Sequence, residues 1–165
     1  YDLPFLAKHC DVFYIGGTKV GAMIGEAVVF TGMKAPKYFF TIVKRHGALL
    51  AKGRMLGIQF DTLFTDNLYF KVSQHAINMA VRICDIFKKH GIAIAYDSPT
   101  NQQFVVLPKK LYEALSQKVA FEIWERKSDE EIVCRFVTSW ATKEEELDGL
   151  DRILTALCGA CRDED

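Results

Sequence analysis

The chain has 165 residues, of which half are apolar and a quarter are charged, so it is long enough to bury a core and too apolar for a disordered chain. Lysine plus arginine and aspartate plus glutamate each number 21, a balance that suggests neither a basic nucleic-acid surface nor an acidic tail, so no nucleic-acid partner is predicted. No uncharged apolar run approaches the roughly 18 residues of a membrane span, so no membrane partner is predicted.

The start of the chain is unusual. Residues 1–10 predict one or two helical turns, because Leu6 and Ala7 lie three and four positions after Leu3. A strand is predicted immediately afterwards, and the first residue is Tyr1 rather than Met. We therefore expect this chain to be the C-terminal part of a longer protein.

Two short apolar runs, residues 12–15 and 26–30, predict buried strands. The connection between them is rich in glycine and carries Lys19. Glycine lets a backbone approach a bulky ligand closely, and a lysine at the end of a strand is a candidate for Schiff-base chemistry. A solvated hairpin lysine is the alternative. A Walker phosphate loop is excluded, because it requires Ser or Thr where this chain has Val20.

Two helices are predicted next. Apolar residues recur at helical spacing from 37 to 63, with small residues between Gly47 and Gly57. Residues 65–67, Thr-Asp-Asn, predict a break with capping chemistry. A second apolar stripe covers residues 72–87 and ends at the His-Gly pair of residues 90–91.

The remainder predicts a small antiparallel sheet covered by helices. The expected elements are strands at 92–95, 104–107, 119–124 and 132–138 and a short helix at 111–117. Thr142 and Glu145 fit a capping box that opens a final helix. The expected fold class is therefore α/β, with residues 1–65 forming the C-terminal part of a larger domain. Residues 66–165 are expected to form a small α+β domain with its leading helix.

Arg135 is a second candidate site residue. Strand alternation places it on one face with Val133 and Val137. Its planar guanidinium suits two-point binding of a carboxylate. A cross-strand ion pair with Glu122 or Glu125 is the alternative.

The cysteines and histidines predict no special chemistry. Five cysteines, at positions 10, 84, 134, 158 and 161, are odd in number and irregularly spaced, which predicts a reducing, cytoplasmic location. Cys158 and Cys161 form a CxxC at the end of a predicted helix, where a structural role is favoured over a redox or zinc site. The four histidines form no H-x-x-H pattern, so no metal site is predicted.

The lysine segment also carries a family resemblance. Residues 11–21, DVFYIGGTKVG, followed by residues 25–29, resemble the pyridoxal-phosphate (PLP) lysine segment of low-specificity L-threonine aldolases. These enzymes belong to the fold-type-I PLP superfamily, in the group of aromatic β-eliminating lyases and threonine aldolases. The resemblance continues through residues 46–54, 97–103 and 135–142 and so covers nearly the whole chain. It implies a PLP-dependent carbon–carbon lyase that cleaves L-threonine or L-allo-threonine to glycine and acetaldehyde.

The resemblance assigns roles to single residues. It implies that Lys19 forms the covalent link to PLP and that Thr18 lies near the cofactor phosphate. It implies that Arg135 binds the α-carboxylate of the amino-acid substrate. Lys52 and Arg54 fall where related enzymes present basic residues to the active site, although the sequence departs here from the family's G-G-G-M-R-Q type of pattern.

The resemblance also implies a homodimer or homotetramer, and the small residues from Gly47 to Gly57, which allow close backbone approach, are expected near its interface. In the family, the carboxylate beside the pyridine nitrogen and the ring stacked on the cofactor come from chain well before the lysine. Only 18 residues precede Lys19, so we expect the isolated chain to be catalytically inactive. The alternatives are another fold-type-I activity, β-elimination or transamination, and a non-catalytic dimerisation or interaction fragment.

Overall fold

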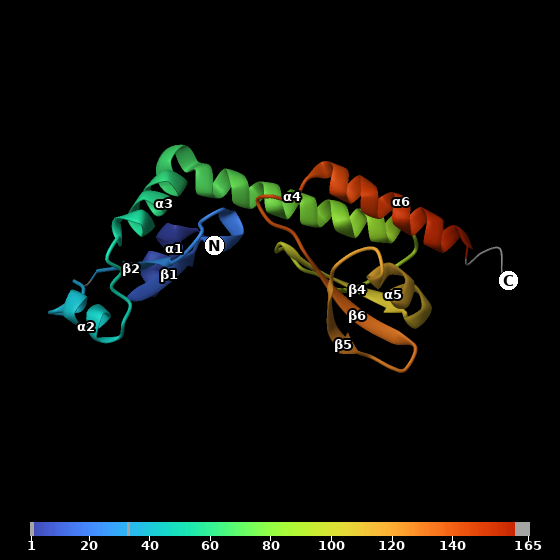
Figure 1. Cartoon of the computed structure of the whole chain (residues 1–165), viewed down its shortest axis with the longest axis horizontal. Coiled ribbons are helices and arrows are strands. Elements are labelled where there is room, and N and C mark those ends of the chain that lie inside the picture. The colour runs from blue at the N-terminus through green and yellow to red at the C-terminus, as the bar shows by residue number, and fades with distance from the viewer. Residues whose placement is uncertain (1, 33, 161–165) are drawn as a thin grey trace. The chain divides into compact units, whose positions relative to one another are not determined.

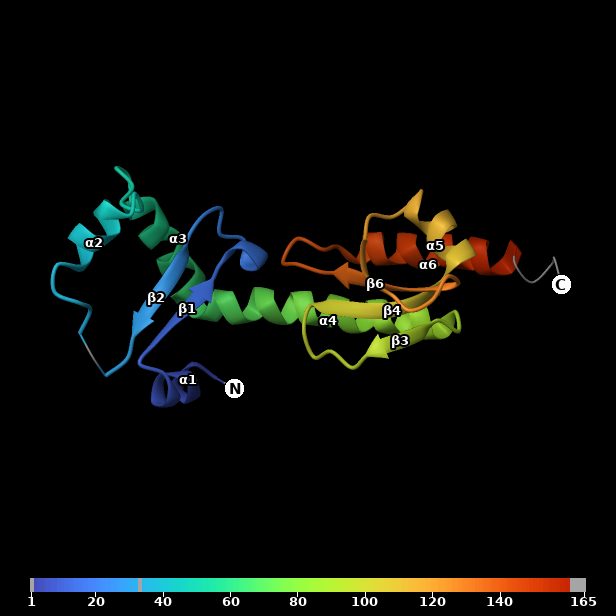
Figure 2. The same cartoon turned by 90° about the horizontal axis from the view of Figure 1, so that it is seen from below.

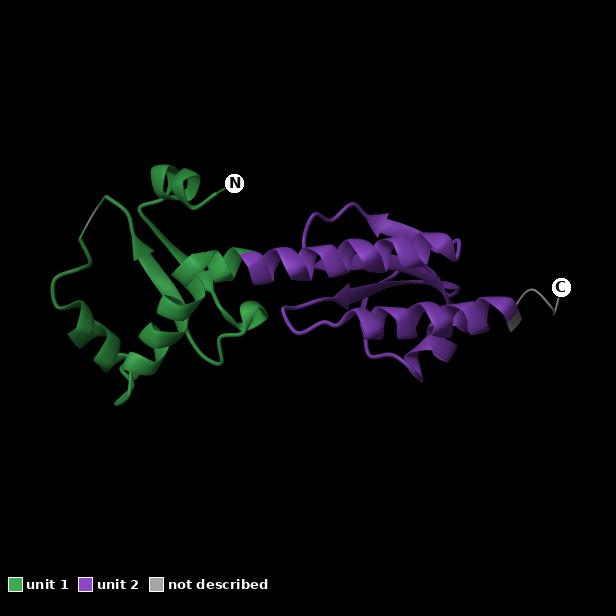
Figure 3. Ribbon diagram, turned by 90° about the horizontal axis from the view of Figure 1, so that it is seen from above, with its two compact units in different colours: residues 1–70 green, residues 71–165 purple. Residues whose placement is uncertain are grey.

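The computed structural model describes residues 2–32 and 34–160. The chain divides into two compact units, residues 1–70 and residues 71–165 (Figure 3), whereas the boundary expected from the sequence follows residue 65. In chain order the elements are α1 (Leu3–His9), β1 (Val12–Gly16), the 3-10 helix η1 (Thr18–Val20), β2 (Glu26–Phe30), α2 (Phe39–Arg45), α3 (Arg54–Phe64), the 3-10 helix η2 (Thr65–Asn67), α4 (Leu68–Lys89), β3 (Ala93–Tyr96), β4 (Gln102–Pro108), α5 (Lys109–Ser116), β5 (Glu122–Arg126), β6 (Glu131–Val137) and α6 (Glu144–Ala160). The units are described separately below.

In the first unit, the strands on either side of Lys19 pair with each other, which confirms the prediction of two adjacent strands. β1 and β2 are antiparallel, with Tyr14 opposite Val28. The prediction that both strands are buried is wrong, because Tyr14 is 70% and Val28 53% exposed. The two strands form a sheet of their own, and the described residues do not cover the face that carries these two side chains.

The single helix predicted over residues 37–63 is wrong, because the structure has α2 and α3 in its place. Gly47 adopts a left-handed φ of 71° just after α2. Its N–H donates to the carbonyl of Lys44, and the N–H of Ala48 donates to the carbonyl of Val43. These two bonds are the Schellman pattern that closes a helix C-terminus, so helical apolar spacing past Gly47 does not continue the helix.

The predicted break at residues 65–67 is confirmed. Asp66 and Asn67 adopt positive φ values of 50° and 57°, and α4 follows with 22 residues. The end of α4 is also as predicted, because Gly91 has a φ of 73° and donates its N–H to the carbonyl of Lys88. No helix of the described chain has the length and apolar character needed to cross a membrane.

The second unit is a four-stranded antiparallel sheet, in the order β3-β4-β6-β5, with α4 and α6 side by side against it (Figures 1 and 2). Phe87 of α4 lies at the centre of its core, fully buried, with its ring 4.8 Å from that of Phe136 on β6. Apolar residues from both helices, α5 and the two central strands β4 and β6 complete the core: Met79, Ile83, Ile86, Val105, Leu107, Leu115, Ile132, Cys134, Leu147, Leu150 and Leu154. The small α+β fold predicted for this part is therefore present.

The predicted strand 119–124 begins too early. The N–H of Val119 donates to the carbonyl of Leu115, so the chain is still turning out of α5 at this point, and β5 starts only at Glu122. Phe121 lies just outside the strand and stacks on Phe136 at 4.7 Å between ring centroids. It contributes to the core from a loop rather than from a strand.

The predicted capping box is shifted by one residue. The hydroxyl of Thr142 accepts the N–H of Ser139 at 2.9 Å, which closes a turn before the helix. Glu146, rather than Glu145, reaches back to accept the N–H of Lys143 at 2.9 Å. α6 therefore begins at Glu144, because the turn engages the hydroxyl that would have capped it.

Charged side chains tie α4 to α6. Arg82 pairs with Glu144 and Asp148, and Lys89 and His90 both bond to Asp151. The hydrogen bond from Lys89, and then that from His90, lower the pKa of Asp151 below its usual value. The Arg82 and Lys89 pairs include exposed side chains, so water and salt screen them and each contributes little to stability.

Candidate functional site

Lys19 lies on a short, tightly closed turn between β1 and β2. The carbonyl of Gly17 accepts two N–H bonds, from Val20 at 3.1 Å and from Ala22 at 2.8 Å. Val20 and Ala22 are buried, whereas Lys19 is exposed. The turn is thus anchored on its apolar side, and it presents the lysine on its open side.

Helix α3 supports the rest of this connection. The side chain of Gln59 accepts the N–H of Met23 at 2.6 Å and donates to the carbonyl of Ile24 at 3.2 Å. Both polar ends of one amide are therefore used to hold the backbone that follows Lys19. Nothing in the sequence around Gln59 distinguishes it from other polar residues of a predicted helix.

Gly17 is required by space rather than by backbone conformation. A Cβ at this position would lie 2.6 Å from the Cβ of Ala22 and 3.1 Å from the ring of Phe60. At Gly16, the neighbouring glycine, the nearest atom is Glu26 Oε1 at 4.0 Å. The pair therefore offers a matched test of how closely the turn must pack.

We expect Gly17→Ala to lower the free energy of unfolding of the first unit by about 1–3 kcal/mol, because the added methyl group overpacks the turn. Gly16→Ala should change it by less than about 0.5 kcal/mol. Urea unfolding of the two variants, followed by circular dichroism, measures the difference. Equal free energies of unfolding would show that the turn rearranges around the added methyl group without loss of stability and is not rigid.

A cavity of about 290 Å³ opens beside the turn, lined by Gly16, Thr18, Lys19, Val20 and Tyr69; we refer to it as the Lys19 cavity. Tyr69, at the start of α4, donates its hydroxyl to the carbonyl of Gly16 at 2.9 Å and stacks on Phe64 at 5.2 Å. Burial raises the pKa of Tyr69 above its usual value, so it stays a neutral hydrogen-bond donor. Sequence reasoning missed this residue, which stands 53 positions after Gly16.

The groups on the open side of the turn fit PLP in two respects. Lys19 offers a primary amine, and Thr18 beside it offers a hydroxyl; neither has a hydrogen-bond or ion-pair partner among residues 2–32 and 34–160. An amine suits the cofactor's carbonyl carbon, and a hydroxyl suits a phosphate oxygen. The residues that line the Lys19 cavity include no carboxylate for the pyridine nitrogen.

Lys52 and Arg54 lie in the turn before α3 and at its first residue, and both are exposed. Neither belongs to the residues that line the Lys19 cavity. Their assignment to the active site stays a prediction.

Arg135 belongs to the second unit, on β6, and its guanidinium already has partners. It pairs with Glu122, which stands directly opposite on β5, and it donates from Nη1 to Gln102 Oε1 at 3.0 Å. The ring of Trp124 lies 5.6 Å from its central carbon. The cross-strand ion pair with Glu122, which was the alternative predicted from the sequence, is thus present. The role of Arg135 in substrate binding stays a prediction.

Two of the partners of Arg135 could not be predicted from the sequence. Gln102 and Trp124 look like ordinary polar and aromatic strand residues. Trp124 is the extra residue of a β-bulge between Ile123 and Glu125, and the bulge turns its ring toward the arginine. Periodicity cannot locate such an extra residue.

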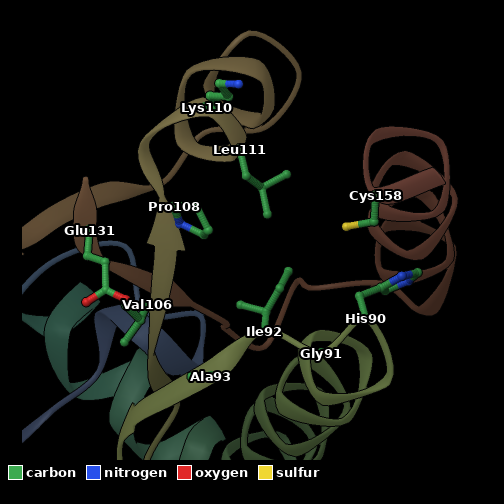
Figure 4. A pocket seen from close by; sticks show the side chains of 10 residues that line it. All are labelled: His90, Gly91, Ile92, Ala93, Val106, Pro108, Lys110, Leu111, Glu131 and Cys158. Carbon is green, nitrogen blue, oxygen red and sulfur yellow. The ribbon is translucent and has the colours of Figure 1, made fainter. Parts of the chain in front are cut away.

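The second unit also holds a cavity of about 460 Å³ at the end of α4 (Figure 4). Ile92, Leu111 and the thiol of Cys158 point into it, and none of the predicted site residues lines it. Cys161, the other half of the CxxC, lies outside the described residues. Within the described residues, no group of three or more His, Cys, Asp or Glu side chains is placed to hold a metal ion.

Comparison with known proteins relates the chain to one group of enzymes. No protein-family model matches it. It is 27% identical over 152 residues to the low-specificity L-threonine aldolase of Pseudomonas aeruginosa, covering 91% of this chain and 43% of that enzyme. The enzyme of the same description from Pseudomonas sp. (strain NCIMB 10558) is 28% identical over 109 residues, which are 66% of this chain and 32% of that enzyme.

A solved structure agrees with this relationship. The structure of Leishmania major threonine aldolase superposes with a TM-score of 0.90 and 35% identity, covering 96% of this chain and 46% of that one. The chain therefore spans less than half the length of the relatives that it matches. It is a relative of the low-specificity L-threonine aldolases, with a mixed α/β fold that matches part of theirs.

Proposed function

We propose, from the relationship of this chain to the low-specificity L-threonine aldolases, that it is the C-terminal half of a PLP-dependent lyase. The whole protein would cleave a β-hydroxy-α-amino acid such as L-threonine or L-allo-threonine to glycine and acetaldehyde. The observation that carries the proposal is the amine of Lys19, which lines the Lys19 cavity and has no hydrogen-bond or ion-pair partner among the described residues. The turn that carries it is closely packed at Gly17.

Bound PLP would supply the electron sink for cleavage of the bond between Cα and Cβ. The amine of Lys19 would hold the cofactor through its carbonyl carbon, and its nitrogen would afterwards be free to carry a proton. The hydroxyl of Thr18 would donate to a phosphate oxygen. Tyr69, held against Gly16, would form the fixed wall of the site.

Arg135 would bind the α-carboxylate of the amino acid. Its guanidinium is kept in place by the Trp124 ring and by Gln102, so little side-chain entropy remains to be lost on binding. We further propose that the protein is a cytoplasmic homodimer or homotetramer, in which Lys52 or Arg54 contributes a basic group to the site. The exposure of both side chains supports that last assignment.

Borohydride reduction in the presence of PLP, followed by peptide mapping, tests the proposal on the full-length protein. We expect one pyridoxyl group per chain, on Lys19. The same preparation should form acetaldehyde and glycine from L-threonine. Pyruvate and ammonia from serine would indicate β-elimination, a new keto acid would indicate transamination, and an unlabelled, colourless protein would favour a non-catalytic fragment.

A further inference from the structure

The guanidinium of Arg135 is already paired with a carboxylate, that of Glu122. The side chain of Glu122 contacts Nη2 of the arginine across the β5–β6 pair. A substrate α-carboxylate that binds the same guanidinium must compete with this glutamate for it. The pair therefore bears on how the proposed substrate enters.

The two members of the pair differ in how firmly they are held. Arg135 has a side chain only 26% exposed, bonded to Gln102 and lying over Trp124. Glu122 has a side chain 67% exposed, and Arg135 is the only partner that its carboxylate has within the described residues. The glutamate can thus swing into solvent while the arginine stays in place.

The guanidinium also has an unused donor. Its Nε is buried and has no hydrogen-bond partner among the described residues. A carboxylate that binds a guanidinium in the two-point manner uses such a donor together with a terminal nitrogen. Glu122 reaches only Nη2. Nε is therefore a donor left for a ligand carboxylate that gains access to it.

We propose that Glu122 is an internal competitor that occupies Arg135 until the substrate's α-carboxylate displaces it. The inference rests on the proposed function, in which Arg135 is the carboxylate-binding residue. Glu122 then sets the affinity for the amino acid, and it reserves the arginine for ligands that bind more firmly than an exposed, single-contact glutamate.

The expected effect is modest and measurable. Exposed ion pairs of this kind change an equilibrium by roughly two- to fivefold, because water and salt screen them. Glu122→Gln removes the charge but keeps the shape of the side chain, and it should tighten carboxylate binding at Arg135 by about that factor. Glu125→Gln is the matched control, because this neighbouring carboxylate bonds to the hydroxyl of Tyr96 rather than to Arg135.

Trp124 provides a readout that does not depend on catalysis. In a Trp140→Phe background it is the only tryptophan left among the 165 residues, and its ring lies against the Arg135 guanidinium. A Trp124→Phe variant in the same background measures the emission of any tryptophan elsewhere in the full-length protein, and this emission is subtracted. The full-length protein is titrated with sodium acetate and with glycine at constant ionic strength, and Trp124 emission is followed. Arg135→Gln in the same background should abolish the saturable change.

Tighter binding in Glu122→Gln, with Glu125→Gln unchanged, would support the inference. Equal or weaker binding in Glu122→Gln would overturn it, and so would the absence of a saturable response in both proteins. Failure of the proposed function is a separate result: borohydride would then label no specific lysine or a lysine other than Lys19. If borohydride labels Lys19 but Glu122→Gln does not change carboxylate binding, the proposed function would remain and only the proposed role of Glu122 would be overturned.

Discussion

Replacing Lys19 by alanine should reduce threonine cleavage by the full-length protein by at least about 10²- to 10⁴-fold. This is the range expected when a positioned group that moves protons is lost, and here the same nitrogen would also hold the cofactor. The visible absorbance of lysine-bound cofactor should disappear as well. The fold should remain, because Lys19 is exposed and makes no hydrogen bond or ion pair with the described residues.

Lys44→Ala is the control for this variant. Lys44 is an exposed lysine in the last turn of α2, outside the residues that line the Lys19 cavity. Its loss should leave turnover and absorbance unchanged. Turnover that survives in Lys19→Ala, or borohydride label that persists on one specific lysine of that variant, would show that another residue holds the cofactor.

Phe87→Ala should lower the free energy of unfolding of the second unit by about 3–5 kcal/mol. The ring is 0% exposed and packs against Phe136, so its removal loses buried apolar area and leaves a cavity between α4 and the sheet. Urea denaturation followed by far-ultraviolet circular dichroism gives the difference. A loss below about 1 kcal/mol would mean that the core closes over the gap and that Phe87 is not central to it.

Val81→Ala, on the same helix, separates packing from helix propensity. Val81 is 53% exposed, so the change should stay within about 0.5 kcal/mol of the unmodified protein. The two variants together test whether the apolar stripe of α4 stabilises the unit through one face only.

The sequence predicted the fold best where a strong periodic pattern ends at a glycine. The stripe of α4 and its end at Gly91 are of this kind, because side-chain burial and the left-handed glycine favour the same boundary. The prediction was wrong where these two signals disagree. Apolar spacing continues past Gly47, but the glycine's positive φ and its two hydrogen bonds end α2 there.

Other features were not predicted because two hydrogen bonds compete for one side chain, or because the contacting residues lie far apart in the sequence. At the start of α6, Thr142 has two possible uses for its hydroxyl, and only the structure shows that the Ser139 N–H takes it. Lys19 could be singled out because its glycine-rich surroundings are local in sequence. Tyr69 could not, since its contact with Gly16 depends on how α4 begins after the kink at η2.

The turn that joins β5 to β6 has a consequence for insertions and deletions. Ser128 accepts the N–H groups of Glu130 and Glu131 there, so the turn is tightly closed. The pairing that starts at this turn continues to Glu122 opposite Arg135. A deletion that the turn cannot absorb would shift the pairing of the hairpin by one residue and bring Ile123 or Phe121, depending on which strand gives up a residue to the turn, opposite the arginine in place of Glu122. In related sequences, the length of this exposed turn therefore decides whether the arginine has a charged neighbour, even when no residue of the site itself differs.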